Sequence, residues 1–555
     1  MRSCFQRQPR PVVCFFVPTL VVRICDKTID AVIVGAGFAG IYMLYKLRQQ
    51  GLEARVIEAG SGVGGTWYWN RYPGARCDIP SMQYSYQFSE DLQQEWDWSE
   101  KYATQGEILT YAEHVVDRFG LRDGITFCSR VVASHYLSEE DRWQVETDQG
   151  EEIKTRFVVM ATGCLSKPNY PNIEGLSEAT VPVYHTGNWP HEGVDFTNKR
   201  VGVIGTGSSA IQSTPIIAQQ AKSLTVFQRT PNYSIPAYNE PLDPDYVSQL
   251  KSRYAEYRQE NWARGFGADF DDNDQSAFEV SDDERRSAYE ARWAKGGLAF
   301  LAAYNDLVFD MKANDTAREF FKDKIAARVD DPALAEKLVP TTPIGCKRLC
   351  VDTDYYEIYN QDHVSLVDLN EAPIACIDGD AIVVGANRHE VDAIVLATGF
   401  DAMTGAVMNI DVRGEKGLSL QEKWADGPRA YLGLATASFP NLFLVTGPGS
   451  PSVLSNMLPS IEQHVEWISD CIEYMNRNQY RAISPETSAE EAWVEHVNEV
   501  AQTSVYPGCN SWYLGANVEG KSRVFMPYLG VPPYVEKCKE VVAAGYEGFQ
   551  LSNTG

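Results

Sequence analysis

Two segments of this chain join a short apolar strand to a glycine-rich turn. Residues 30–34 (DAVIV) lead into GAGFAG at 35–40, and residues 201–204 (VGVI) lead into GTGSSA at 205–210. A strand, such a turn and a following helix form the dinucleotide-binding unit of a parallel α/β sheet, in which the pyrophosphate lies at the start of the helix. We therefore predict an α/β fold with two Rossmann-like dinucleotide-binding domains.

The first unit contains Gly35, Gly37 and Gly40, and a predicted strand at 54–57 ends at Glu58. A carboxylate at this position binds ribose hydroxyls and rejects a 2′-phosphate, so the unit should take FAD or NAD rather than NADP. The next stretch, GVGGTWYWNRYPGARCD at 62–78, is expected to wrap over a flavin. It embeds charged side chains among aromatic rings, where charge must be paired or functional. The alternative is that its arginines pair with surface acids.

The second unit contains Gly205 and Gly207, and small Ala210 lets the helix pack on the strand. Its second strand, 224–227, is followed by Arg229 where the first unit has its acid. An arginine can bind a 2′-phosphate with two hydrogen bonds, which predicts NADPH. An exposed arginine at a strand end is the alternative.

The order of these features predicts the domain organisation. Strands at 156–160 and 391–396 each run into Ala-Thr-Gly, expected where the chain crosses between the two domains, and 236–340 shows helical spacing. The predicted parts are an N-terminal extension (1–27), the FAD domain (28–163 and 392–555), the NADP domain (164–235 and 341–391) and a helical insertion (236–340).

The composition of the chain excludes several classes of binding partner. The 555 residues carry a net charge of −26, which disfavours nucleic acid and anionic membranes. No apolar run is long enough to span a membrane, and no metal site is predicted. The 12 cysteines are scattered without a CxxC, so we expect free thiols in a reducing, cytoplasmic setting. Residues 1–27 have the outline of a secretion signal or an organelle address, or form a dispensable extension.

From residue 30 onward the chain resembles the type I Baeyer–Villiger monooxygenases, particularly the branch acting on phenylacetone, steroids and polycyclic ketones. The resemblance rests on GGTWYWNRYPGARCD, HTGNWPHE, GTGSSA, VFQRTP, CKRLC…DYYE, ATGFDA, GPGSPSVLSNM and SWYLGAN. It implies an NADPH-dependent FAD enzyme that inserts one oxygen atom of O2 beside a ketone carbonyl through a flavin C4a-peroxide, giving an ester or lactone. A monomer or a weak homo-oligomer is expected.

The resemblance also implies residue roles. Arg348 matches the active-site arginine and Asp78 its acid partner, while Lys347 and Arg229 match the residues that bind the 2′-phosphate. The remaining implied residues are Gly65, Thr66, Trp67 and Tyr84 for FAD, Ser208 for NADP, Trp512 near the nicotinamide and substrate, Val453, Leu454 and Met457 in the substrate pocket, and His185 and Trp189 in the family signature.

One part of the signature departs from the family pattern F-x-G-x-x-x-H-x-x-x-W-P. Ala179 and Val181 occupy its Phe and Gly positions, and Gly175 is out of register. This is either a tolerated loop change or an altered coupling between domains.

Three other functions remain open from the sequence. A flavin N- or S-hydroxylase shares both nucleotide sites but needs no arginine at the flavin. A pyridine-nucleotide disulfide reductase needs a redox dithiol near the first helix, and a flavin-binding sensor needs no substrate. Lys347 and Arg348 could likewise be only a basic surface pair.

Overall fold

The computed structural model describes residues 27–553 of the chain. The predicted N-terminal extension lies outside the described residues, apart from Lys27 at the start of the first strand. Within the described range, no helix combines the length and the apolar character needed to cross a bilayer.

The first sheet contains the parallel order β3-β2-β1-β6-β18. Its members are β1 (Lys27–Val34), β2 (Ala54–Ile57), β3 (Ile125–Thr126), β6 (Glu152–Met160) and β18 (Leu442–Leu444). Helix α1 (Phe38–Gln49) connects β1 to β2. Ala31, Val32 and Ile33 of β1 are fully buried, as expected for a strand covered on both faces. On the side of β6 where β18 pairs, the sheet also continues through β5 (Arg142–Thr147), β4 (Val131–Leu137) and β17 (Asp411–Arg413).

The second sheet is wholly parallel, in the order β12-β9-β8-β16-β7. Its members are β7 (Val183–His185), β8 (Arg200–Ile204), β9 (Ser223–Gln228), β12 (Val364–Asp368) and β16 (Ala393–Leu396), with helix α5 (Ser208–Gln220) between β8 and β9. The two sheets have the same strand arrangement. In each, the strand that leads into the glycine-rich turn (β1 or β8) lies third, and the strand that runs into Ala-Thr-Gly (β6 or β16) lies next to it. An antiparallel meander of β13 (Ile374–Asp378), β14 (Ala381–Val384) and β15 (Asn387–Glu390) follows β12.

One predicted domain boundary needs correction. The division between 391 and 392 assigns β16 to the first domain, but β16 pairs with β7 and β8 of the second sheet. The second domain therefore extends at least to Leu396. The sequence could not show this, because a buried parallel strand reads the same in either sheet.

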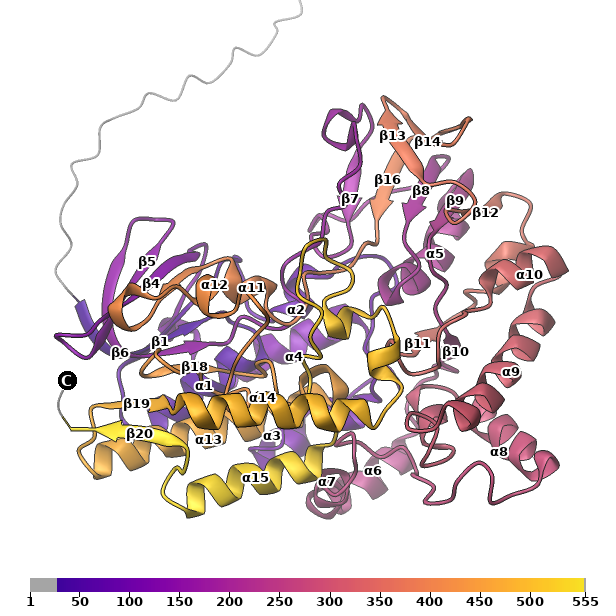
Figure 1. Ribbon diagram of the computed structural model, residues 1–555. Helices are drawn as coiled ribbons and strands as arrows, with labels where there is room; N and C mark the ends of the chain where they lie inside the picture. The colour runs from indigo at the N-terminus through magenta and orange to yellow at the C-terminus, as the bar shows by residue number, and fades with distance from the viewer. Residues whose placement is uncertain (1–26, 554–555) are drawn as a thin grey trace, which may run out of the picture.

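The helices between the two halves of the second domain lie together at one side of the molecule (Figure 1). They are α6 (Pro244–Ser252), α7 (Tyr254–Trp262), α8 (Asp282–Lys295), α9 (Met311–Arg328) and α10 (Pro332–Leu338). Local sequence sets their starts: Asp243 caps α6, which has proline in its first turn, and Ser281 and Glu284 form a capping box on α8. Strands β10 (Ser234–Pro236) and β11 (Cys350–Asp352) pair in parallel across the ends of the insertion.

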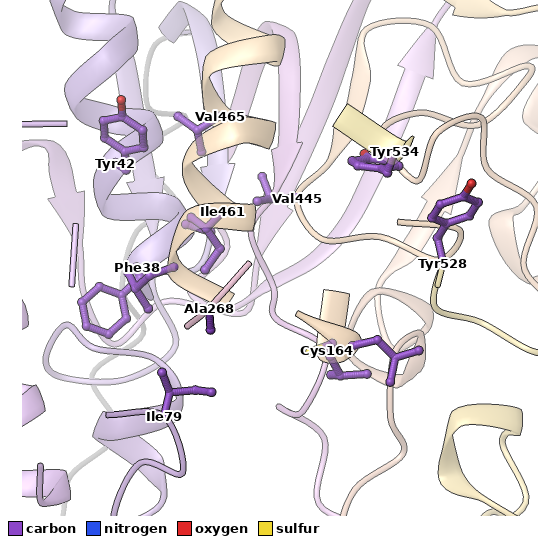
Figure 2. Packing of buried hydrophobic residues seen from close by; sticks show 14 of the residues in the cluster. Phe38, Tyr42, Ile79, Cys164, Ala268, Val445, Ile461, Val465, Tyr528 and Tyr534 are labelled. Carbon is purple, nitrogen blue, oxygen red and sulfur yellow. The ribbon is translucent and has the colours of Figure 1, made fainter. Parts of the chain in front are cut away.

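The first sheet is covered by helices from both ends of the chain. These are α2 (Thr66–Trp69), α3 (Glu90–Glu95) and α4 (Gln105–Arg118) from the N-terminal part, and α13 (Met457–Arg477), α14 (Thr487–Gln502) and α15 (Val531–Ala543) from the C-terminal part. Figure 2 shows Phe38 and Tyr42 of α1 close to Ile461 and Val465 of α13, all within one buried cluster. Helix α13 begins at Met457, after the Gly-Pro loop that follows β18.

The smaller elements connect these layers. They are α11 (Gly405–Met408), α12 (Leu420–Lys423), the β19 (Ala482–Pro485) and β20 (Phe549–Ser552) pair, and short 3-10 turns that include η7 (Ser452–Leu454), η8 (Tyr506–Gly508) and η9 (Trp512–Leu514).

Candidate active site

The first glycine turn lies at the carboxyl end of β1, between the strand and α1. Gly35 has φ +102°, and a Cβ there would lie 2.7 Å from the carbonyl oxygen of Ala161. Glu58, at the end of β2, is buried and accepts hydrogen bonds of 2.6 Å from the backbone N–H groups of Ala36 and Gly60. The carboxylate is thus fixed beside the turn, where the ribose of a bound dinucleotide would lie.

The stretch after Glu58 returns to the same turn. Gly65 has φ +55°, and a Cβ on it would lie 2.8 Å from the Cα of Gly37, the N-cap of α1. Thr66 and Trp67 begin α2, and Trp67 Nε1 donates to the Tyr84 hydroxyl at 3.1 Å. The backbones of Gly65 and Gly37 are therefore in contact, and a side chain on Gly65 would separate them. A backbone without side chains at this turn suits the close approach of a cofactor pyrophosphate.

The second turn repeats the geometry of the first. Gly205 has φ +112°, and a Cβ there would lie 2.4 Å from the Ala397 carbonyl oxygen, the counterpart of the Ala161 contact. Gly207 is the N-cap of α5, Ser208 is its first residue, and nothing lies within 4 Å of a Cβ built on Gly207. Free space and N–H groups at a helix N-terminus form an anion-binding site.

Arg229 and Lys347 lie close together although they are far apart in sequence. Burial lowers the pKa of Lys347, and the positive charge of Arg229 lowers it further. Among the ion pairs of residues 27–553 neither side chain has a carboxylate partner, and Arg229 is exposed. Two adjacent unpaired cations beside the second turn suit a bound 2′-phosphate.

Asp78 and Arg348 form a bidentate ion pair between the two sheets. The distances are 2.6 Å from Arg348 Nε to Asp78 Oδ2 and 3.0 Å from Nη2 to Oδ1. Nη1 donates to the Val453 carbonyl oxygen at 2.8 Å, and the guanidinium lies 5.3 Å from the Phe266 ring centre. Burial alone would lower the pKa of Arg348, but the charge and hydrogen bonds of Asp78 outweigh it and raise that pKa.

The other arginines of the 62–78 stretch have structural partners. Arg76 pairs with Glu100 at 2.8 Å and donates to the Tyr102 carbonyl oxygen. Arg71 donates to the Tyr68 carbonyl oxygen and lies over the Tyr68 ring. Arg76 therefore pairs with an acid, as the alternative hypothesis for this stretch expects. Asp78 is the charged residue of the stretch that contacts Arg348.

Of the predicted pocket residues, Val453 contacts Arg348 directly. Val453 and Leu454 are buried in η7, and Met457, partly buried, begins α13. Trp512, partly buried in η9, contacts Tyr513 with ring centres 4.2 Å apart and ring planes tilted by 54°. Tyr513 lies within electrostatic range of Arg348, which partly offsets the rise in its pKa caused by burial.

The signature histidine contacts the crossing between the domains. His185 Nδ1 accepts from the Gly187 N–H at 2.9 Å, and Nε2 lies 3.3 Å from Thr398 Oγ1. Thr398 in turn donates to the Asn169 carbonyl oxygen at 2.6 Å. Burial lowers the pKa of His185 to about 4, so the ring is neutral. Trp189 is buried against Phe196 in the core of the second domain.

The unusual signature positions lie in the second domain, away from the turns. Ala179 and Val181 pack against the buried cluster around Ile377 and Ile382. Gly175 has φ +75°, and a Cβ there would lie 2.0 Å from the Ile377 carbonyl oxygen. This glycine therefore serves the contact with β13 rather than the signature.

Two features of the site were missed by the sequence analysis. Phe266 reaches Arg348 from the helical insertion, and no motif marks it. The expectation of free thiols is wrong for Cys346 and Cys509, which form a disulfide. They are 163 residues apart, so only the fold brings them together. Cys77, Cys350 and other cysteines of the described residues are free.

Comparisons with known proteins agree with this geometry. A family model described as pyridine nucleotide-disulphide oxidoreductase matches residues 32–288, which include both glycine turns. A Baeyer–Villiger monooxygenase of Pseudooceanicola batsensis is 39% identical over 524 residues, covering 93% of this chain and 95% of the relative. The chain belongs to the Baeyer–Villiger monooxygenases.

Other comparisons place this Baeyer–Villiger monooxygenase among its relatives. Phenazine N-monooxygenase PhzNO1 of Lysobacter antibioticus is 39% identical and covers 95% of this chain and 98% of its own. The structure of an oxidized steroid monooxygenase bound to NADP is 52% identical with a TM-score of 0.91, covering 95% of this chain and 100% of that one. This monooxygenase is an FAD- and NADPH-dependent enzyme with two Rossmann-like domains.

Proposed function

We propose that Arg348 and Asp78 form the catalytic pair of this Baeyer–Villiger monooxygenase, acting on bulky aryl or polycyclic ketones. The observation that carries the proposal is the Arg348 guanidinium, which donates two hydrogen bonds to Asp78 and one to the Val453 carbonyl oxygen. The ketone class is inferred from the identity to the steroid monooxygenase and from the family branch that the motifs resemble.

The residues of this chain fit both cofactors. Glu58 and the backbone of Gly37 and Gly65 would hold FAD, and Gly205, Gly207 and Ser208 would hold the pyrophosphate of NADPH. Arg229 and Lys347 would bind the 2′-phosphate. Bound FAD would supply the redox chemistry, which is the transfer of electrons from NADPH to O2.

Arg348 supplies a permanent positive charge at the reacting centre. A guanidinium does not lose its proton at working pH, so it stabilises negative charge that develops on oxygen. Two fixed bonds to Asp78 and one to the Val453 carbonyl oxygen remove its freedom to rotate, so little reorganisation is needed during the reaction. The guanidinium also lies over the Phe266 ring, 5.3 Å from its centre, which adds a cation–π contact to these attachments.

Trp512 and the η7 residues would complete the substrate pocket. Val453 and Leu454 present apolar surface next to the arginine, and Met457 is a flexible side chain able to adapt to a ketone. His185 would act on domain coupling, since it contacts the crossing at Thr398 rather than the reacting atoms.

The test is the Arg348→Ala enzyme, assayed with NADPH and a panel of small, aryl and polycyclic ketones. We expect continued NADPH oxidation with no ester or lactone. Arg388→Ala, which removes an exposed arginine of β15, should leave product formation unchanged. Normal ester yield from Arg348→Ala would refute the assignment.

The second candidate function is oxygenation of nitrogen or sulfur. The observation behind it is the 39% identity to the phenazine N-monooxygenase. An arginine fixed at the site argues against it, because a protonated oxygen donor needs no cation beside it. Phenazines and thioethers in the same panel distinguish the two: an N-oxide or sulfoxide formed at the ketone rate by Arg348→Ala would favour the second function.

We further propose a cytoplasmic monomer or weak homo-oligomer that takes O2 and a ketone as its small-molecule substrates. Fractionation of cells and sedimentation of the purified enzyme over a range of concentrations test these two statements. A secreted enzyme or a stable dimer at low concentration would contradict them.

A further inference from the structure

The disulfide between Cys346 and Cys509 lies directly beside the proposed catalytic residues. Cys346 precedes Arg348 by two residues, and Cys509 precedes Trp512 by three. The Cα atoms of the two cysteines are 6.2 Å apart. The bond thus joins the segment that carries the arginine to the segment that carries the pocket tryptophan.

The arginine side of this link is firmly held. Asn314 of α9 is fully buried, and its amide donates to the Ile344 carbonyl oxygen and accepts from the Ile344 N–H, both at 2.9 Å. These bonds fix the backbone just before Cys346 on the helical insertion. Arg348 itself is fixed by Asp78.

The tryptophan side has fewer attachments. Figure 1 shows the segment between α14 and α15, in yellow, running toward the region between the two sheets. Its later half is anchored to the domain crossing, because Lys521 Nζ pairs with Asp401 at 2.6 Å and Asn517 donates to the Phe400 carbonyl oxygen at 2.6 Å.

The earlier half of this segment contains Cys509 and Trp512. Most hydrogen bonds of the described residues 505–516 stay within 503–530. One leaves this range: the Val505 N–H donates to the Val308 carbonyl oxygen at 2.9 Å. Apolar packing of Tyr506 and Tyr513 adds to it. The disulfide is therefore the strong attachment of this half to the arginine segment.

We propose that Cys346 and Cys509 are positioning residues that form a thiol-reversible tether. The oxidised bond holds Trp512 against the arginine segment, and reduction releases residues 505–516. The inference rests on the proposed roles of Arg348 and Trp512. It also rests on the proposed cytoplasmic setting, because disulfides in reducing compartments are usually transient and serve sensing or catalysis.

Hydrogen peroxide is the oxidant class that this chemistry requires. One thiol reacts with it to give a sulfenic acid and water, and the second thiol displaces a further water to form the S–S bond. A small dithiol reverses the step: its two sulfur atoms form a disulfide, and both cysteines regain their protons. Cys346 is fully buried and Cys509 is 5% exposed, so exchange requires local opening of the segment.

The first experiment maps the bond in the holoenzyme by mass spectrometry of unreduced peptides. We expect a cross-linked Cys346–Cys509 peptide after treatment with hydrogen peroxide and two alkylated cysteines after treatment with dithiothreitol. Cys376, a free cysteine of β13, should be alkylated in both samples. Absence of the cross-linked peptide after peroxide would overturn the proposal.

The second experiment measures amide hydrogen exchange of 505–516 in the oxidised and reduced enzyme and in Cys509→Ser. We expect exchange at least about tenfold faster without the bond, and KM for NADPH and ketone raised about tenfold with a smaller change in kcat. Cys376→Ser should match the wild type. Equal exchange in oxidised and reduced wild-type enzyme would overturn the tether. Amide hydrogen exchange is measured without catalytic turnover. A failure of the tether proposal can therefore be distinguished from a failure of the proposed function.

Discussion

Arg348 and Asp78 are 270 residues apart in sequence and share two hydrogen bonds, of 2.6 and 3.0 Å, between the two sheets. Asp78 follows the stretch that lies over the first glycine turn, and Arg348 comes from the segment just before β11. The pair therefore joins two segments that lie far apart in the chain, and a contact between these segments fixes the side chain of Arg348.

Asp78→Asn should keep the charge of Arg348 but weaken its orientation. The neutral amide cannot accept two charge-assisted hydrogen bonds from the guanidinium. We expect ester formation to fall about 100-fold, because small displacements of a catalytic group are costly. NADPH oxidation should fall less than ester formation. The measurement is the amount of product formed per NADPH consumed. Asp97→Asn, at an exposed carboxylate that pairs with Lys251, is the control and should change neither rate.

Arg229→Ala and Lys347→Ala should change the choice of nucleotide. Each charge-assisted hydrogen bond to a phosphate contributes roughly 1.5–3 kcal/mol. We therefore expect KM for NADPH to rise about 10- to 100-fold in each variant, while KM for NADH stays the same. Steady-state kinetics with both nucleotides provide the measurement. An equal loss with NADH would mean that neither cation binds the 2′-phosphate.

Gly205→Ala and Gly207→Ala should separate folding from nucleotide binding. A Cβ at Gly205 would meet the Ala397 carbonyl oxygen at 2.4 Å, so we expect a lower Tm. Gly207 has free space around a Cβ, so its Tm should be unchanged. The added methyl group should nevertheless obstruct the pyrophosphate and raise KM for NADPH. Calorimetry and kinetics test this, and a wild-type KM in Gly207→Ala would contradict it.

Glu462 should make stability fall as pH rises. This carboxyl group is buried on α13, and burial raises its pKa from 4.5 to about 8, although it accepts from the N–H groups of Gln87 and Phe88. The folded state then holds a proton that the unfolded state has lost, so the free energy of unfolding decreases between pH 4.5 and about 8.

Glu462→Gln removes this titration. Between pH 5 and 9, the wild type should lose roughly 2–4 kcal/mol of unfolding free energy relative to Glu462→Gln. Urea denaturation at several pH values measures the difference. Parallel pH profiles for the two proteins would show that the carboxyl group ionises normally in the fold.

Much of the fold could be predicted from the chain, for local reasons. The strand ending at Ile57, the two glycine turns and the capped start of α6 depend on residues within a few positions of one another. The limits of the predictions lie where a segment has two equivalent partners. Strand β16 shows this, because its apolar side chains fit either sheet.

The candidate site divides in the same way. Glu58 follows the second strand of the first unit, and Arg229 stands at the corresponding place in the second unit. Because this chemical difference is local, the sequence alone distinguishes an FAD turn from an NADP turn. The roles of Arg348 and Asp78 came from family resemblance, since no spacing links them. Phe266 carries no recognisable pattern and was found only in the structure.

The sequence by itself determined the two nucleotide units, the preferred cofactors and the family, because these depend on glycine, strand and charge patterns within short stretches. The tertiary structure decided which distant groups meet. It paired Arg348 with Asp78, placed Phe266 on the guanidinium and joined Cys346 to Cys509. The physical reason is that ion pairs and disulfides depend on distance in space, and chain folding sets that distance independently of the separation in sequence.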